Sequence, residues 1–509
     1  MGKTEELQMM LMGKNKKKGG DRNPEAFFDK LVPFIIGAFF CFLFAWYGVG
    51  QYPDSVTYMG YTTDREPLYP MFLMLCRAAA GEAHFLWLAV LLQNVLAFFS
   101  FWYLYRFWVR QFRLNLLFRV AALLIILAPH LLVSLFSASG IILTNAVLSE
   151  GLTVSLYPLF AVLLLEAFYR EKKRSYVITS YIVAILLSLI RGQLMPLLLV
   201  WLMTTAVSVI RTGRNRNAAR AGGQKYTKKA YLLMIFMLSV FTVFGFVIRQ
   251  SVIHVYHTAM TDGVVRSNTG GNVTFLTNTL YCADERAVSQ AAEKLSGSEA
   301  ALLYEMYADM RRQGLRAEDA GSGFHARILH HEDSHDKIKF ELLGEQLFRT
   351  VRSEWDQLPQ AELMDRDGAR MSVEEDEIAG RLMKALLPHC IGSYLTTYLY
   401  VAAGGFVRTV SLLSPVFSIY ALFIYAAAVV LMCVLFRKAQ GRAAAWLMAI
   451  VLLMTAANVC ATALTIMCLS RYMIYNMSLF YLAGLVCVWE AYRIRRGGTS
   501  GAEICTQPE

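Results

Sequence analysis

Long apolar runs separated by short polar stretches dominate the chain. A helix of about 20 apolar residues is long enough to cross roughly 30 Å of hydrocarbon. The pattern predicts ten membrane-spanning helices, at residues 31–50, 85–105, 120–136, 144–168, 176–192, 194–210, 230–250, 415–436, 443–468 and 472–490. An even number of crossings places both termini on the same side of the membrane. We therefore expect an all-α polytopic membrane protein.

One long polar segment, residues 251–395, interrupts the series of spans. Within it, apolar residues recur at helical spacing over 285–314 and 336–355, which predicts a small, mainly helical domain outside the membrane. Residues 391–413 are apolar again, but an eleventh crossing there would break the alternation of the loops. We expect this stretch to lie along the membrane interface instead.

These elements divide the chain into five parts. The expected parts are a cytoplasmic basic tail (1–30), a seven-span module (31–250), an extracytoplasmic domain (251–395), an interfacial helix with three C-terminal spans (396–492) and a cytoplasmic tail (493–509).

The composition agrees with this division, and the distribution of charge indicates which face of the bundle is cytoplasmic. The chain is 56% hydrophobic and 17% charged, and its mean hydropathy is +0.42. Residues 251–395 carry 15 basic and 23 acidic residues, a net charge of −8. The rest of the chain has a net charge of +19, and the two parts sum to the overall +11. The basic clusters all fall at one face of the predicted bundle, at 14–18, 171–174, 211–229, 437–442 and 493–496. The positive-inside rule makes that face cytoplasmic, so membrane lipids rather than nucleic acid account for the basic balance.

The nine cysteines form no metal-binding pattern. No CxxC pair occurs, and most of the cysteines lie inside apolar runs, where a free thiol behaves as a small hydrophobic group. Cys282 and Cys390 alone fall in the extracytoplasmic segment. The sequence leaves a disulfide between these two open.

The stretch "YPDSVTYMGYTTDREPLYP", residues 52–70, follows the first span. Its prolines stiffen the backbone, and "REPLYP" resembles the start of a short apolar helix at the surface. Asp54 and Arg65 would then be presented at membrane depth rather than on a solvated loop. Asp64 and Glu66 adjoin Arg65 and are most simply its partners.

Several further charged residues lie at the outer ends of the predicted spans. A carboxylate at membrane depth costs about 2.5–3.5 kcal/mol on insertion scales, so Glu150 should face a polar cavity or a partner. Arg191, Arg249 and Arg471 lie at outer span ends, where the positive-inside rule predicts few arginines. An outer cavity with carboxylates and guanidinium groups suits a phosphorylated lipid.

The order of these motifs resembles one enzyme superfamily. "PDSVTYMGY", "REPLYPMFLMLCRAAAG", "LSEGLTVSLYPLFAVLLLEA", "LLSLIRGQLMPLLLVWLM" and "SRYMIYNMSLFYL" are similar to the C-type (GT-C) membrane glycosyltransferases, which include protein O-mannosyltransferases and lipid A aminoarabinose transferases. The resemblance implies a GT-C-like arrangement of the spans, with a catalytic acid after the first span, matched by Asp54, and a second acid matched by Glu150. Segment 251–395 departs from that pattern and leaves the acceptor open.

The expected activity follows from the resemblance and from the chemistry of these residues. We expect inverting transfer of a sugar from a polyprenyl-phosphate donor to a hydroxyl of a glycan, lipid or protein at the outer face of a bacterial plasma membrane. A carboxylate would accept the hydroxyl proton, and cations would stabilise the phosphate leaving group. The expected catalytic residues are Asp54 and Glu150, and the expected phosphate-binding residues are Arg65, Arg191, Arg249, Arg471 and Tyr472.

Other functions share parts of this pattern. A lipid-linked polysaccharide polymerase or ligase would also have many spans and outer arginines, but it would not need Asp54. A lipid transporter or flippase would need charged residues near the middle of the membrane, where the spans hold few. "HARILHHEDSHD", residues 325–336, does not combine helically spaced histidines with a placed third ligand. We expect no cofactor, although the sequence leaves a divalent metal ion open.

Overall fold

The computed structural model describes residues 24–136, 140–170, 174–219, 228–357 and 367–497. The chain is an all-α polytopic membrane protein, and the described residues form no strand beyond an isolated bridge between Gly50 and Ala146. Most of the two predicted basic tails, residues 1–23 and 498–509, lies outside the described ranges.

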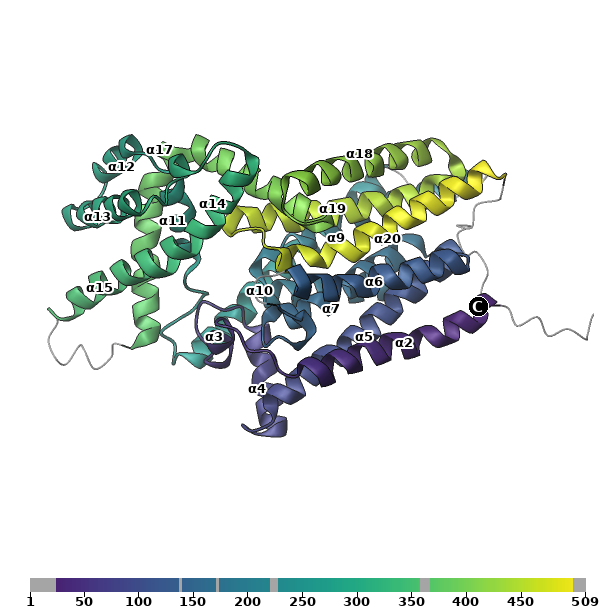
Figure 1. Ribbon diagram of the computed structural model, residues 1–509, viewed down its shortest axis with the longest axis horizontal. Coiled ribbons are helices and arrows are strands. Elements are labelled where there is room, and N and C mark those ends of the chain that lie inside the picture. Colours follow the sequence, from purple (N-terminus) through teal and green to yellow (C-terminus); the bar gives the residue numbers. More distant parts are fainter. Residues whose placement is uncertain (1–23, 137–139, 171–173, 220–227, 358–366, 498–509) are drawn as a thin grey trace, which may run out of the picture.

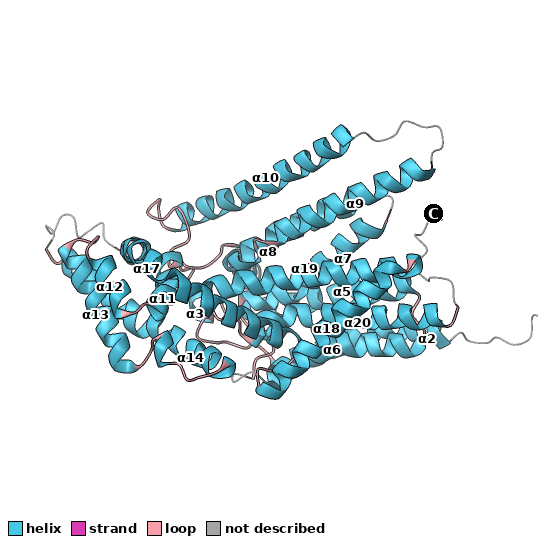
Figure 2. Cartoon of the chain, turned by 90° about the horizontal axis from the view of Figure 1, so that it is seen from above, coloured by secondary structure: helices cyan, strands magenta, loops and turns pink. Residues whose placement is uncertain are grey.

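Every predicted span forms a helix. In chain order these helices are α2 (Pro24–Tyr47), α5 (Phe85–Phe112), α6 (Leu116–Phe136), α7 (Ser149–Tyr169), α8 (Arg174–Ile190), α9 (Leu197–Ala219), α10 (Lys228–Met260), α18 (Pro415–Arg437), α19 (Arg442–Thr465) and α20 (Ser470–Arg495). They run roughly along the long axis of the molecule (Figure 1). α2 begins and α20 ends at the same end of this bundle (Figure 1), as an even number of crossings requires. Seen from above, α9 and α10 lie along one side of it (Figure 2).

Ten described helices are long and apolar enough to cross a membrane, but they are not the same ten that the sequence predicted. α8 has 17 residues and is shorter than the others, whereas α17 (Gly368–Val410), with 43 residues, belongs to the set. α17 continues through the expected domain boundary at residue 395, so 391–410 is the apolar end of a long helix rather than a separate one. Its location at the membrane interface stays a prediction.

The polar segment forms a helical domain at one end of the bundle (Figure 1). Its helices are α11 (Gly271–Cys282), α12 (Glu285–Ala292), α13 (Gly297–Gln313), α14 (Phe324–Asp336) and α15 (Gly344–Trp355), with the first half of α17. Local sequence sets their ends: Asp284 caps α12, and Ser296 forms a capping box with Glu299 at the start of α13. A core separate from that of the bundle, with Leu280, Met306 and others, holds the domain together.

Specific contacts attach this domain to the bundle. The Asn278 side chain donates to the carbonyl of Thr465 at 2.9 Å, and the Tyr394 hydroxyl donates to that of Leu464 at 2.8 Å. Both carbonyls lie at the end of α19. The domain is therefore seated where α19 gives way to α20.

Two short helices complete the molecule beside this junction. α3 (Ser55–Met59) and α4 (Leu68–Ala80) follow the first span. α4 is the short apolar helix that "REPLYP" predicted, and it packs on α5.

Candidate functional site

Asp54 lies at the start of α3, in a turn that its neighbours fix. The Tyr52 amide donates to Ser55 Oγ at 2.9 Å, and the Ser55 amide donates back to the Tyr52 carbonyl at 2.8 Å. The Thr57 hydroxyl bonds the Asp54 carbonyl at 2.7 Å. The Asp54 carboxylate makes no capping bond to α3, so it is available to other partners.

Two arginines from distant parts of the chain contact this carboxylate. Arg65 Nη2 is 3.0 Å from Asp54 Oδ1, and Arg471 Nη2 is 3.5 Å from Oδ2. Two contacts with α3 hold the Arg65 side chain in place. Its Nε donates to Thr57 Oγ1 at 2.8 Å, and its guanidinium lies 4.7 Å from the centre of the Tyr58 ring. The Asp54 side chain remains 35% exposed. The carboxylate is therefore accessible to solvent.

Glu150 lies in the first turn of α7 and is almost fully buried, with 4% of its side chain exposed. Arg191 Nη1 is 2.9 Å from its Oε2, and Arg471 Nε is 3.6 Å from its Oε1. The Ser149 hydroxyl, 3.2 Å from Oε2, also donates to Glu150, and Tyr58 donates to Ser149 Oγ at 2.9 Å. Two guanidinium groups thus neutralise a carboxylate that would otherwise be costly at this depth.

Tyr472 contacts both of the arginines that bind Glu150. The Arg191 guanidinium lies 4.4 Å from the centre of its ring and the Arg471 guanidinium 4.9 Å. Arg471 Nη2 also donates to the Tyr472 hydroxyl at 2.7 Å. The ring face attracts both cations and so keeps them close together despite their like charge.

Amide side chains of the bundle fix the turn that leads into α7. Asn145 donates to the carbonyls of Leu43 at 2.9 Å and Gly48 at 2.7 Å, which ties the turn to the end of the first span. Gln93, in α5, donates to the carbonyls of Thr144 at 3.0 Å and Ala146 at 3.1 Å. This buried network joins the end of α2 and α5 to the turn before α7. These amides lie in apolar stretches of the sequence and were not among the predicted site residues.

Arg249, expected with the other phosphate-binding residues, has a separate partner. It forms a mostly buried ion pair with Glu66, and its Nε donates to the Ser188 carbonyl at 3.2 Å. A Cβ at Gly192 would lie only 2.6 Å from Glu66 Oε1, so this pair needs a glycine directly after Arg191. Burial raises the pKa of Glu66, and Arg249 opposes that shift. Glu66 is therefore the partner of Arg249, not of Arg65, and phosphate binding by Arg249 stays a prediction.

The histidine-rich segment forms α14, and its buried side chains bind other residues of the protein. His331 is buried and its Nε2 lies 3.1 Å from Asn278 Oδ1. Glu332 forms a bidentate ion pair with Arg408. Among the residues that the structure describes, no group of three His, Cys, Asp or Glu side chains is placed to hold a metal ion. Cys282 and Cys390 are both free thiols.

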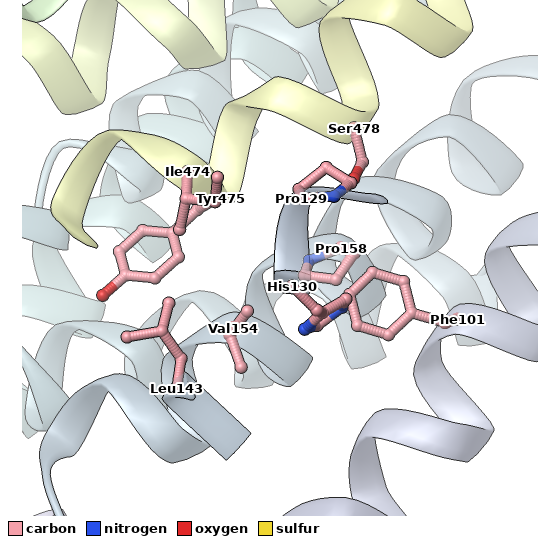
Figure 3. A pocket seen from close by; sticks show the side chains of 9 residues that line it. All are labelled: Phe101, Pro129, His130, Leu143, Val154, Pro158, Ile474, Tyr475 and Ser478. Atoms are coloured by element: carbon pink, nitrogen blue, oxygen red, sulfur yellow. The ribbon is translucent and has the colours of Figure 1, made fainter. Parts of the chain in front are cut away.

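A small cavity lies inside the bundle next to the site (Figure 3). Figure 3 shows Tyr475 of α20 on one side and His130 of α6 on the other, with Val154 of α7 between them. The cavity has a volume of about 10 Å³, which is enough for one water molecule and far too small for a sugar.

Comparisons with protein-family models, curated proteins and solved structures found no match to this chain. The site must therefore be interpreted from its own residues. The structure brings six of the seven predicted residues into one network, namely Asp54, Arg65, Glu150, Arg191, Arg471 and Tyr472, and places Arg249 in a neighbouring ion pair.

Proposed function

We propose that the protein is a membrane glycosyltransferase that moves a sugar from a polyprenyl-phosphate donor to a hydroxyl of an extracytoplasmic acceptor, with inversion at the anomeric carbon. One observation carries the proposal: an accessible carboxylate, Asp54, lies between two guanidinium groups at one end of a membrane bundle. This arrangement supplies a proton acceptor and phosphate-binding cations within a few ångströms of each other.

The two oxygens of Asp54 have different tasks in this reaction. Oδ1 is held by Arg65 at 3.0 Å, which orients the carboxylate. Oδ2, at 3.5 Å from Arg471, is the less strongly bonded oxygen and accepts the proton of the acceptor hydroxyl. The hydroxyl oxygen then bonds to the anomeric carbon as the bond from that carbon to the phosphate oxygen breaks. The phosphate leaves with the electron pair, and the arginines stabilise its charge.

Glu150 has a supporting task in the same site. It is buried and in contact with both Arg191 and Arg471, so it cannot easily reach an incoming hydroxyl. Its charge holds the two guanidinium groups together at the place where a lipid phosphate would bind. The expectation that Glu150 is catalytic becomes, in this proposal, a role in positioning the arginines.

The distribution of charge along α7 supports an enzyme rather than a transporter. Glu150 and Glu166 lie at opposite ends of this buried helix, and no charged residue lies between them. Glu166 is paired with Arg110 and Arg170 at its own end. A path for an ionic substrate would need polar groups along the length of such a helix.

A substitution at Asp54 tests the proposal. The purified protein in nanodiscs should release polyprenyl phosphate from one of a panel of polyprenyl-phosphate sugars when acceptors are supplied. Asp54→Asn keeps the size of the side chain and removes its basicity, so the rate should fall about 10²–10⁴-fold, the usual contribution of a positioned base. Donor affinity should change little.

Asp356→Asn is the control, because Asp356 pairs with Arg352 at 3.3 Å in an exposed ion pair at the end of α15 and contacts none of the site residues. It should retain most of the activity. Transfer at a near wild-type rate by Asp54→Asn would rule out Asp54 as the base.

A further inference from the structure

A second group of charged residues lies at the other end of the bundle, away from the polar domain. Arg119 of α6, just past the end of α5, is 2.9 Å from Glu25 and 2.8 Å from Asp29, both in the first turns of α2. α5 therefore ends where α2 begins, at the end of the bundle opposite the polar domain (Figure 1).

Glu166 holds two arginines together at this end. It lies in the last turn of α7, and only 1% of its side chain is exposed. Arg110 Nη2 is 2.6 Å from Glu166 Oε1. Arg170 binds both oxygens of the same carboxylate, with its Nη2 3.3 Å from Oε1. One buried carboxylate thus fixes two guanidinium groups side by side despite their like charge.

Both of these guanidinium groups keep donors for a further partner. The Arg110 side chain is 54% exposed and that of Arg170 is 35% exposed. Among the described residues, Arg110 Nε and Nη1 and Arg170 Nη1 make no hydrogen bond. The Arg170 guanidinium also lies 5.2 Å from the centre of the Tyr176 ring, which helps to fix its orientation.

One face of α5 connects these arginines to the apolar part of the membrane. Residues three and four positions apart share a face of a helix, and this face comprises Val95, Phe99, Trp102, Arg106 and Arg110. Val95 is 40% exposed and Phe99 53% exposed. The Arg106 guanidinium lies 5.2 Å from the centre of the Trp102 ring. An exposed apolar strip therefore runs directly into two exposed arginines one turn apart.

The charges at this end of the bundle do not cancel. Five arginines lie against three carboxylates there, a net charge of +2, namely Arg106, Arg110, Arg113, Arg119 and Arg170 against Glu25, Asp29 and Glu166. The adjoining sequence "EKKR", residues 171–174, lies mostly outside the described residues and holds one acid and three bases, a further net charge of +2. The surplus is positive with or without that stretch.

We propose that this face of α5, together with Arg170, binds one anionic phospholipid in the leaflet away from the polar domain. Arg106, Arg110 and Arg170 donate to the phosphate oxygens, as guanidinium groups do in proteins. An acyl chain lies along Val95 and Phe99. Only a molecule with both an anionic group and an apolar chain matches this surface, and the positive surplus favours a headgroup with net negative charge. The inference does not depend on the proposed function.

Lipid titration followed by native mass spectrometry tests the inference. The full-length protein, delipidated in detergent, is mixed with palmitoyl-oleoyl phosphatidylglycerol or with the corresponding phosphatidylcholine, and the bound lipids are counted. One phosphatidylglycerol should bind about tenfold or more tightly than phosphatidylcholine. Equal binding of the two lipids would overturn the inference, because the charge of the headgroup would then not be recognised. Displacement of phosphatidylglycerol by millimolar inorganic phosphate would assign the site to a soluble anion and would overturn it as well.

Substitutions locate the bound lipid. The double variant Arg106→Gln/Arg110→Gln should weaken the binding of phosphatidylglycerol about tenfold or more, because two charge-assisted hydrogen bonds are lost. Glu166 keeps Arg170 as its partner in this variant. Arg106→Gln alone breaks no ion pair and should weaken binding about fivefold, the usual effect of one basic residue near an anionic headgroup.

Arg437→Gln is the matched control. Arg437 is an exposed arginine in the last turn of α18, and this helix ends on the side of the bundle away from the polar domain (Figure 1). The variant should bind phosphatidylglycerol within about twofold of wild type. An equal loss of affinity in the Arg437 variant would mean that general surface charge attracts the lipid, and wild-type affinity in both α5 variants would place the lipid elsewhere. Either result would overturn the inference.

Discussion

Asp54 and Glu150 carry the same charge in different surroundings. Asp54 is 35% exposed and Glu150 only 4%, although the two share Arg471 as a partner. An exposed ion pair contributes little to stability, whereas removing one member of a buried pair leaves an uncompensated charge. The two carboxylates should therefore respond differently to neutralisation.

Glu150→Gln should destabilise the protein, because Arg191 and Arg471 would lose their common counter-charge. The expected cost is about 3–5 kcal/mol, the range for breaking a buried ion pair, and it should appear as a lower unfolding temperature in detergent. Asp54→Asn, measured alongside, should unfold within a few degrees of wild type. A Glu150→Gln protein that unfolds at the wild-type temperature would contradict the prediction that these two ion pairs stabilise the fold.

The turn before α7 depends on one glutamine of α5. Gln93 donates to two backbone carbonyls of this turn, those of Thr144 and Ala146, and accepts from the Tyr69 hydroxyl at 3.0 Å. These groups are buried, so each must have a partner or incur a desolvation penalty. The turn, α4 and α5 are thereby joined at one side chain.

Gln93→Leu should destabilise this junction at nearly constant volume. Each unpaired buried group costs about 1–3 kcal/mol, so the variant should unfold at a clearly lower temperature. Hydrogen exchange of residues 143–151 should also increase. Gln313→Leu, at the exposed end of α13, is the control and should change neither quantity. Unchanged exchange in the Gln93 variant would show that the turn is held by its backbone alone.

The polar domain and the bundle meet at a buried ion pair close to the site. Arg408, near the end of α17, pairs with Glu332 of α14 and also donates to the Cys468 carbonyl at 3.0 Å. Cys468 lies three residues before Arg471. The same guanidinium group therefore connects the position of the domain to that of a site arginine.

Arg408→Gln should loosen this connection, because Glu332 would remain partly buried without its cation. Hydrogen exchange should increase both in α14 and over residues 466–473, and donor affinity should fall. Arg349→Gln is the control: it removes an exposed ion pair with Glu345 on α15 and should leave both regions unchanged. Faster exchange in α14 alone would separate domain seating from the position of Arg471.

The sequence determined the elements of this protein. A helix in hydrocarbon satisfies its own backbone hydrogen bonds and needs only a run of apolar residues, so all ten predicted spans are helices. The helical domain followed in the same way from periodic apolar positions. Charged residues at the outer span ends are conspicuous because they are costly there, which is why Asp54, Glu150, Arg191 and Arg471 could be selected before their contacts were known.

Tertiary structure decided which of these charges meet. Arg249 resembled the other outer arginines in sequence, but in the folded chain its partner is Glu66, from the loop between α3 and α4. α17 runs on through the predicted boundary because its apolar residues pack against α19 and α20. Apolar runs are a local property of the chain, whereas an ion pair between residues hundreds of positions apart exists only once helix packing has brought them within 4 Å.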